Sequence, residues 1–531
     1  MTILFLIIIH YNSSLFTTRQ QGHPVTSALL TDLYQLTMAY GYWKLGMHER
    51  EAVFHQIFRK QPFQNSYSVA CGLATVVDFL QHWHFSESDL SYLEGLRTPN
   101  DKPLFSAEFL DYLKTLRFSC DIDAIPEGNL VFPHEPLLRV KGPLLQGQLI
   151  ESTLLNIINF QTLIATKAAR VCQAAHGEPV LEFGMRRAQG PDGAMSASRA
   201  AYIGGCAATS NVLAGKLYGI PVSGTHGHSW VTAFPDELSA FNAYAEVMPH
   251  NCVLLVDTYD TLQGVRHAIE IGKKLHERGA ELRAIRLDSG DLASLSIKAR
   301  KLLDEAGLRK TKIIASNSLD EYEITKQKQQ GAATSIWGVG TSLTTAYDHA
   351  ALDGVYKLTA LATGDGAWEY KLKISEQAIK TSNPGIHQVR RFFRNKKPVM
   401  DVIYDLELGI PFKSSMVSLE APHKTTQCEH YDETLDLLQP IFRRGKLVAE
   451  METIQALRDR ALHQVTEFSK TRDEKPYLVG LEHNLHHLKQ LLTIMRRLWC
   501  LRLGHGSGKK ICTISKLLSG MHCPNTSTAS A

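Results

Sequence analysis

Between residues 180 and 345 the chain repeats one arrangement of apolar and polar positions. A short apolar run ends in a polar cluster that contains glycine, and a stretch with helical spacing follows. The apolar runs are PVLEFG (179–184), GIPVSGT (219–225), CVLLVDT (252–258), LRAIRLDSG (282–290), KIIASNS (312–318) and SIWGVGT (335–341). Apolar runs of this length between turn signals are typical of buried parallel strands. The alternation therefore predicts an α/β unit built on a parallel sheet.

The polar clusters of this unit all follow their strands. Parallel strands bring their carboxyl ends to one edge, and α/β barrels and open sheets keep their active sites there. The segments between the runs, such as 261–281 and 291–310, show helical spacing with exposed charges. Six units favour an irregular α/β barrel, although periodicity alone does not separate a closed barrel from an open sheet.

The flanking regions lack this rhythm and predict a second, smaller α/β (α+β) domain built from both ends of the chain. A helix starts in ALLTDLYQLTMAYGYW with Thr31 as the expected N-cap. YKLKISE, HQVRRFF and PVMDVIYDLE are expected strands. The predicted division is a disordered extension (1–26), an N-terminal α/β domain (27–160), the barrel with the active site (161–360), a C-terminal segment packing on the N-terminal domain (361–490) and a disordered basic tail (491–531).

Charge is concentrated at the C-terminal end. The formal net charge is +4, but no acidic residue follows Glu482, and residues 483–531 carry seven lysines and arginines, which leaves −3 on the rest. The body therefore gives no sign of nucleic-acid binding. The tail is either a basic amphipathic helix for a membrane or partner, or an extension without function; we favour the extension.

The apolar start and the cysteines bear on location. The apolar run 3–9 lacks a basic flank and is too short to span a bilayer, so we favour a mis-assigned or disordered start over a signal peptide. Nine cysteines without a CxxC pair argue against structural zinc and a disulfide framework. A cytoplasmic protein without a membrane partner is the expectation.

Two neighbouring strand ends have the composition of a phosphate site. WGVGTSL (337–343) offers Gly338, Gly340 and Thr341, with free backbone N–H groups and a hydroxyl at a presumed helix start. ASNSLDE (315–321) adds Asn317 and Ser318. A plain tight turn with an N-cap explains one such loop alone. Two such loops on adjacent strands favour an anion-binding site over a plain turn.

Arginines and carboxylates follow three further strands. IRLDSGDLAS (285–294) places Arg286, Asp288 and Asp291 around one glycine turn, which suits a carboxylate or phosphate, Mg²⁺ or ribose hydroxyls. A surface salt bridge is the alternative. Arg186 and Arg187 in 181–194 suit a pyrophosphate or lie on the surface. Asp257 and Asp260 suit Mg²⁺ or hydroxyls, and Asp257 or Thr258 also suits a helix N-cap.

The remaining cluster is GTHGHSWV (224–231), with His226 and His228. The pair fits a nucleophile, or a metal clamp in a metal-dependent hydrolase that would need Asp257 and Asp288 as further ligands. The chain has no Walker A motif and no dinucleotide GxGxxG after a strand. A sugar polyphosphate is the simplest ligand for these clusters together.

Taken in order, these motifs resemble those of the nicotinate phosphoribosyltransferase family. The resemblance rests on TDLYQLTMAYGYW, EFGMRRAQGPDGAMSASRAAYIGG, SNVLAGKLYGIPVSGTHGHSWV, LLVDTYDTLQG, RLDSGDL, ASNSLDE and GVGTSL, and it covers about residues 27 to 490. It implies synthesis of nicotinate mononucleotide and pyrophosphate from nicotinate and 5-phosphoribosyl 1-pyrophosphate, the first step of NAD biosynthesis from nicotinate. It also implies Mg²⁺, ATP as a co-substrate hydrolysed through a phosphohistidine, an irregular barrel beside a smaller domain, and a homodimer.

The resemblance also implies roles for single residues. The family motif Gly-Thr-x-x-His-Ser assigns the phosphorylated histidine to His228 and leaves His226 as a bystander or supporting donor. Catalytic residues would be His228, Arg286 and Asp288, and Asp288 would also be the Mg²⁺ ligand. Tyr34, from this subunit or its partner, and Phe183 would sandwich the nicotinate ring, and Thr225 and Arg286 would hold its carboxylate. Gly338, Gly340 and Thr341 would take the 5-phosphate, and Arg186, Asp257, Ser289, Gly290 and Asn317 would complete the substrate site.

Three alternatives remain beside this interpretation. One is a nicotinamide phosphoribosyltransferase. Residues 204–211 argue against it, because they offer Ser210 where nicotinamide-using relatives have an aspartate. An arginine without an opposing carboxylate favours nicotinate, by roughly thirtyfold or more. The others are the metal-dependent hydrolase with His226 and His228, and a catalytically inactive homologue.

Overall fold

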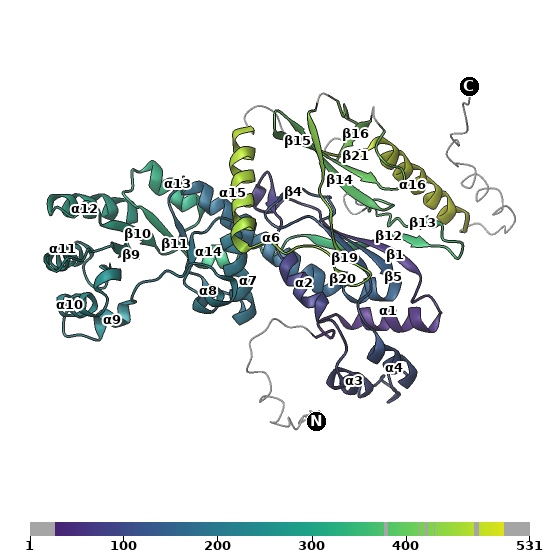
Figure 1. Ribbon diagram of the computed structural model, residues 1–531, viewed down its shortest axis with the longest axis horizontal. Coiled ribbons are helices and arrows are strands. Elements are labelled where there is room, and N and C mark those ends of the chain that lie inside the picture. The colour runs from purple at the N-terminus through teal and green to yellow at the C-terminus, as the bar shows by residue number, and fades with distance from the viewer. Residues whose placement is uncertain are drawn as a thin grey trace, which may run out of the picture.

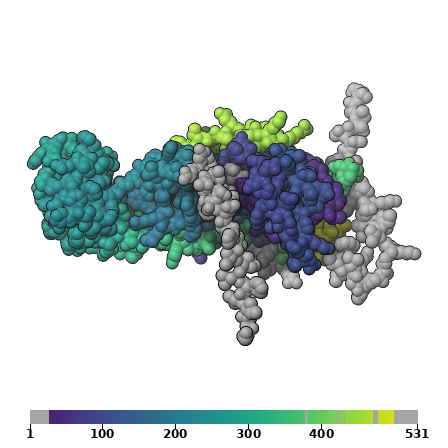
Figure 2. Space-filling model, turned by 90° about the horizontal axis from the view of Figure 1, so that it is seen from below, coloured from purple at the N-terminus to yellow at the C-terminus, as the bar shows by residue number. Residues whose placement is uncertain are grey.

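The computed structural model describes residues 27–375, 381–411, 414–419, 423–429, 431–471 and 477–503 of the 531-residue chain. The predicted extension 1–26 and residues 504–531 of the predicted tail lie outside this range. The molecule is elongated, with a parallel α/β unit at one end and mostly antiparallel sheets at the other (Figures 1 and 2). The predicted α/β class is therefore confirmed.

A six-stranded parallel sheet forms the α/β unit, in the order β7-β6-β11-β10-β9-β8. Its strands are Val180–Glu182 (β6), Ala208–Thr209 (β7), Val253–Leu255 (β8), Ala284–Leu287 (β9), Lys312–Ser316 (β10) and Ile336–Val339 (β11). Helices Gly190–Ile203 (α7), Val212–Tyr218 (α8), His228–Thr232 (α9), Glu237–Val247 (α10), Thr261–Glu277 (α11), Leu292–Glu305 (α12), Glu321–Gln329 (α13) and Thr341–Thr344 (α14) connect them. Five of the six predicted runs contain these strands.

The sixth predicted run, 219–225, is not a regular strand. It makes one parallel bridge between Thr209 and Val222, and its neighbour His226 accepts a hydrogen bond from the Leu255 amide at 3.2 Å. The segment thus lies between the edge strands β7 and β8. Pro221 and two glycines explain why it forms only this short contact, because proline lacks an N–H donor and glycine weakens strands.

The strand side chains alternate between the two faces of the sheet, as the pleat requires. Leu254, Ile285 and Trp337 belong to the large core. Val253, Ala284, Ile314 and Ile336 form a separate small cluster on the opposite face.

Seven antiparallel strands, in the order β13-β12-β1-β5-β3-β19-β20, combine both ends of the chain. They are Glu51–Phe58 (β1), Asp121–Ala124 (β3), Leu138–Pro143 (β5), Gly354–Ala362 (β12), Trp368–Tyr370 (β13), Gln439–Arg443 (β19) and Lys446–Leu447 (β20). Ser68–Val69 (β2) and Leu130–Val131 (β4) form a small separate ladder. The helices of this region are Leu33–Lys44 (α1), Leu73–Gln81 (α2), Glu87–Glu94 (α3), Ala107–Thr115 (α4), Leu144–Leu149 (α5) and Glu151–Ala174 (α6).

A third sheet of six strands has the order β17-β16-β21-β15-β14-β18. Its strands are His387–Arg394 (β14), Lys397–Asp405 (β15), Ser415–Ser418 (β16), Thr425–Gln427 (β17), Glu433–Asp436 (β18) and Leu478–Glu482 (β21). Helix α15 (Ile454–Thr471) lies between the two halves of the molecule and contacts α7, β4 and β15. Helix α16 (His483–Leu503) packs on β16 and β21 (Figure 1).

Three local expectations need correction. Helix α1 begins after Asp32, not Thr31, because the Thr31 hydroxyl donates to the Leu149 carbonyl at 3.0 Å instead of capping the helix. The strand expected in YKLKISE ends at Tyr370. Residues 491–503, the start of the predicted disordered tail, are helical because they continue α16, which is anchored by the buried Leu485. No helix among the described residues is long and apolar enough to cross a bilayer.

Candidate active site

Arg286 lies at the centre of the predicted site, near the carboxyl end of β9. Its Nε donates to the Ser316 hydroxyl at 2.8 Å, and its terminal nitrogens donate to Thr225 at 3.2 Å and to Asp288 at 2.9 Å. The ends of β9 and β10 and the segment 219–225 therefore fix one guanidinium. An arginine has five N–H donors, so two remain among the described contacts, one on each terminal nitrogen. This is the fork that binds a carboxylate through two hydrogen bonds.

Phe183 follows β6 and faces this guanidinium, whose central carbon is 5.5 Å from the ring centre. Glycines make room for the ring. A Cβ on Gly338, which is buried in β11, would lie 2.7 Å from ring carbons of Phe183, and one on Gly340 would lie 3.3 Å from the Phe183 carbonyl oxygen. The absence of a side chain at Gly338 thus makes room for the aromatic ring.

Two carboxylates follow β8 and β9. Asp288 accepts from Arg286, and from Ser316 through a short hydrogen bond. Buried Asp257 accepts from the Asp288 amide at 3.0 Å and from the Ser289 hydroxyl at 2.5 Å, both through Oδ2. Its Oδ1 has no partner and is buried. A buried acceptor without a donor is costly, so this oxygen is suited to a ligand hydroxyl.

The two histidines of residues 224–231 have different environments. His226 is buried, accepts the Leu255 amide at Nε2, and approaches the Gly227 carbonyl with Nδ1 at 3.3 Å. Burial lowers its pKa, and the positive charge of Arg286 adds to the effect. Both ring nitrogens are engaged, so His226 is a structural residue. The metal clamp made of both histidines is therefore excluded by this geometry.

His228 is the first residue of α9, and its side chain is 45% exposed. Its Nδ1 lies 3.1 Å from the Thr258 hydroxyl, and its Nε2 lies 3.8 Å from Asp288 Oδ2. The edge of the sheet formed by the carboxyl ends of its parallel strands is called the rim. If Nδ1 carries the proton and donates it to Thr258, Nε2 presents a lone pair toward the rim. The imidazole is then oriented as a nucleophile beside the carboxylate.

The predicted phosphate residues lie on the same rim. Asn317 and Ser318 follow β10 with φ of 90° and 51°, a left-handed conformation that is uncommon for residues other than glycine. Thr341 begins the short α14, with Gly340 before it. Gly290 turns the chain after Asp288 with φ of 78°. Arg186 and Arg187 are exposed in the 3₁₀ turn Met185–Arg187.

Tyr34 is the one predicted site residue that the chain does not bring to this rim. It lies in the first turn of α1, 49% exposed, close enough to Glu151 and Asp32 for their charges to raise its pKa after the larger effect of burial. Helix α1 belongs to the opposite half of the molecule from the parallel sheet (Figure 1). Within the described chain, no ring pair joins Tyr34 to Phe183.

Three residues that shape the site were not predicted to act there. Ser316 connects Arg286 with Asp288. Thr258 orients His228. Glu182 is fully buried and accepts the Ser198 hydroxyl at 2.9 Å and the Thr209 hydroxyl at 2.6 Å, which fixes the backbone just before Phe183. An acidic residue inside an apolar strand was the available signal for Glu182.

The carboxylates around Asp288 decide whether this part of the site fits Mg²⁺. Among the described residues, no group of three His, Cys, Asp or Glu side chains could hold a metal. Mg²⁺ is commonly bound by one or two carboxylates together with substrate phosphates, so Asp288 alone fits an ion that is also bound to a substrate phosphate.

Ser210, which follows β7, donates its amide to the Glu182 carbonyl at 2.9 Å and so lies beside the Phe183 backbone.

Three segments of the chain match models of one protein family. The N-terminal domain of nicotinate phosphoribosyltransferase matches residues 29–159, the nicotinate phosphoribosyltransferase family matches 179–400, and its C-terminal domain matches 386–489. A Bacillus subtilis protein named nicotinate phosphoribosyltransferase is 50% identical over 365 residues, 68% of this chain and 73% of that protein. A Dictyostelium discoideum protein of that name is 36% identical, and the match covers 89% of this chain and 88% of that protein. The crystal structure of human nicotinic acid phosphoribosyltransferase has a TM-score of 0.75 at 30% identity, and the match covers 87% of this chain and 99% of that chain.

Proposed function

The chain belongs to the nicotinate phosphoribosyltransferase family, and we propose from this premise that it converts nicotinate and 5-phosphoribosyl 1-pyrophosphate into nicotinate mononucleotide and pyrophosphate. The observation that carries this proposal is Arg286, whose three fixed hydrogen bonds leave two donors for a carboxylate. Nicotinate has that carboxylate and nicotinamide does not. The names of the relatives agree with nicotinate as the substrate.

The ring nitrogen of nicotinate is the nucleophile in this reaction. It attacks the anomeric carbon of the ribose, the bond to the pyrophosphate oxygen breaks, and both electrons of that bond leave with pyrophosphate. No general base is required because the pyridine nitrogen carries no proton. Phe183 and Arg286 orient the ring, and orientation of two reactants can supply several kcal/mol of the barrier.

The rim groups would hold the second substrate. Asp257 Oδ1, buried without a partner, suits a ribose hydroxyl. The turn at Gly340 and Thr341 suits the 5-phosphate, with Asn317 beside it, and Arg186 suits the pyrophosphate. Asp288 would hold Mg²⁺, which supplies positive charge for the departing pyrophosphate. Arg286 keeps the Asp288 carboxylate in place through its hydrogen bond.

ATP coupling is assigned to His228. Attack of its Nε2 on the γ-phosphorus of ATP would form an N–P bond and release ADP, and water would later release phosphate. The Thr258 contact at Nδ1 supports this direction of attack. A phosphate on Nε2 would add negative charge beside Asp288 and next to the pyrophosphate pocket.

The test of this function is nucleotide formation from labelled nicotinate and phosphoribosyl pyrophosphate with Mg²⁺, with and without ATP. Product from nicotinate is expected, with nicotinamide at least thirtyfold poorer in kcat/KM. No product from either substrate would show a catalytically inactive homologue, and product from nicotinamide alone would overturn the assignment of Arg286.

A homodimer that completes the site is part of the proposal. Tyr34 is exposed on α1 beside Leu33 and Met38, and Val212 and Leu213 are exposed on α8 near the rim. Exposed apolar residues on helix faces are typical of subunit interfaces. We assign the ring opposite Phe183 to Tyr34 of the partner subunit.

Mixed subunits test this arrangement. Tyr34→Ala and His228→Ala are each expected to be inactive in the ATP-coupled reaction as pure proteins. After random exchange of subunits, about a quarter of the wild-type activity should return, because half of the dimers are mixed and each contains one intact site. If Tyr34 acts in its own subunit, mixing restores nothing.

A further inference from the structure

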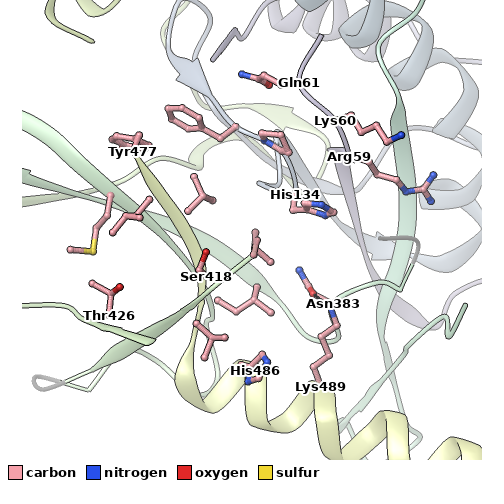
Figure 3. Close-up of a pocket in the computed structure, with 18 of the residues that line it drawn as sticks. Arg59, Lys60, Gln61, His134, Asn383, Ser418, Thr426, Tyr477, His486 and Lys489 are labelled. Carbon is pink, nitrogen blue, oxygen red and sulfur yellow. Dashed lines mark hydrogen bonds between the residues drawn. The ribbon is translucent and has the colours of Figure 1, made fainter. Parts of the chain in front are cut away.

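A large cavity lies away from the six-stranded parallel sheet, in the other half of the molecule (Figure 3). It measures about 1990 Å³ and is lined by the chain that follows β1, by strands β15, β16 and β21, and by α16. None of its described lining residues belongs to strands β6 to β11. The cavity is therefore separate from the candidate active site, and it is called the basic groove below.

The lining of the basic groove carries one sign of charge. Its lysines and arginines are Arg59, Lys60, Arg394, Lys397, Lys489 and Arg497. No aspartate or glutamate is among its described lining residues. A concave surface with one sign of charge attracts ions of the opposite sign.

Lys489 is the most informative of these residues. Its ammonium group donates to Asn383 Oδ1 at 2.8 Å, and no described carboxylate lies within 4 Å of it. Burial alone lowers its pKa to about 8. An amine withdrawn from water without a counter-charge is unfavourable, and a bound anion would supply that charge.

Two more groups converge on Lys489. The Arg59 guanidinium, 13% exposed, lies 3.7 Å from a half-exposed Asp353 carboxylate. His134 is held with φ of 70°, and its pKa is lowered to about 4 by burial and by the charges of Lys489 and Arg59. Figure 3 shows Asn383 and Lys489 pointing toward His134 from one side of the cavity, with Arg59 and Lys60 beside His134. The His134 imidazole is thus surrounded by two partly buried cations and one carboxylate.

The groove also has length and an apolar floor. Lys489, Thr493 and Arg497 are four residues apart on α16, so they lie on one helix face, and the two cations are about 12 Å apart along the axis. Val399 and Val479 lie half-buried beside them on one face of the third sheet. At its end the Tyr477 ring stacks on Phe132, with centroids 4.4 Å apart.

We propose that the basic groove binds a nucleoside polyphosphate, with its phosphates on Arg59, Lys489 and Arg497 and its nucleoside on the apolar floor. Cations spread over two helical turns match a chain of phosphates rather than a single one. The floor is one face of a sheet that ends at stacked rings, which suits a flat base. The lining shares no residue with strands β6 to β11, so the groove would be a second nucleotide site, apart from the candidate active site.

Chemical labelling of Lys489 locates such binding without measuring activity. The full-length protein is treated with acetic anhydride at pH 8, where a large share of Lys489 is neutral and reactive, and each lysine is followed by mass spectrometry. ATP and inorganic tripolyphosphate should each slow acetylation of Lys489 at least fivefold, and adenosine should not. Lys301 and Lys310, 77% and 86% exposed on α12 and the loop after it, serve as controls and should not change.

Variants provide the second readout. With phosphoribosyl pyrophosphate present to fill the rim, ATP binding is measured by calorimetry for wild type, Arg59→Gln with Lys489→Gln, and Lys310→Gln. The double variant should bind ATP at least tenfold more weakly at the groove, and Lys310→Gln should match wild type; thermal unfolding checks that the double variant is folded.

Three results would overturn the proposal. The first is an absence of Lys489 protection by ATP. The second is equal ATP binding by the double variant and the wild type. The third is tripolyphosphate binding as tightly as ATP, which would limit the groove to phosphate alone. Failure of nicotinate turnover would leave both readouts intact, so this test stands apart from the proposed reaction.

Discussion

A Cβ atom on Gly338 would lie 2.7 Å from Cδ2 of the Phe183 ring, closer than carbon atoms pack. Gly338→Ala must therefore displace the ring that faces Arg286. Overpacking of this kind costs about 1–3 kcal/mol, so we expect a lower unfolding temperature and a KM for nicotinate raised about tenfold. Gly364→Ala is the matched control, because nothing lies within 4 Å of the added atom. Unchanged nicotinate kinetics in Gly338→Ala would contradict a role for the Phe183 ring in binding.

The paired donors of Arg286 lead to a prediction about substrate choice. Arg286→Gln keeps a donor near Thr225 but removes the charge and the fork. Loss of a partner from a buried charged pair costs on the order of 2–5 kcal/mol, so kcat/KM for nicotinate should fall at least thirtyfold, while that for nicotinamide changes far less. Steady-state kinetics with both substrates measure the ratio. Arg309→Gln, on the exposed loop after α12, is the control and should leave both values unchanged.

Much of the α/β unit could be predicted because its strands are apolar runs that are followed by polar and charged site residues. Buried parallel strands need continuous apolar sequence, and their polar ends meet at one edge. Arg286 and Asp288 were expected together, and they lie 2.9 Å apart. The order of the strands was not available from the sequence, because each run pairs equally well with any neighbour.

Other features depend on contacts that local sequence does not encode. Thr31 has the composition of an N-cap, yet its hydroxyl serves the Leu149 carbonyl 118 residues away. Asp260, not Asp257 or Thr258, caps α11, because Asp257 is engaged by Ser289 and the Asp288 amide. The position of Tyr34 away from the rim follows from the packing of α1 in the other half of the molecule, which no spacing of residues reveals.

The contrast between the two histidines gives a paired prediction. His228→Ala should abolish incorporation of labelled phosphate from ATP and the ATP stimulation of product formation, with little change in stability because the side chain is 45% exposed. His226→Ala should instead destabilise the fold by about 2 kcal/mol, since it leaves the buried Leu255 amide without an acceptor. Phosphate labelling and urea unfolding are measured on both. Phosphate bound to the His228→Ala protein would place the modification elsewhere.

The partly buried His134 leads to a prediction about acid stability. Its folded pKa is about 4, below the ordinary value of 6.5, because of burial and the nearby charges of Lys489 and Arg59, which outweigh the opposing carboxylate of Asp353. The unfolded chain therefore binds a proton near pH 6.5 that the folded chain refuses until about pH 4. Stability falls as pH drops through this window, by about 2 kcal/mol from this residue between pH 7 and 5.

The variant that isolates this effect is His134→Asn, because asparagine tolerates the left-handed backbone at φ of 70° and does not titrate in this range. Urea unfolding at pH 7 and 5 should show wild type losing about 2 kcal/mol more than the variant over the same interval. His84→Asn removes an exposed histidine and should keep the wild-type slope. Parallel curves for wild type and His134→Asn would mean that His134 is protonated equally in both states, and the groove would then already be open to water at Lys489.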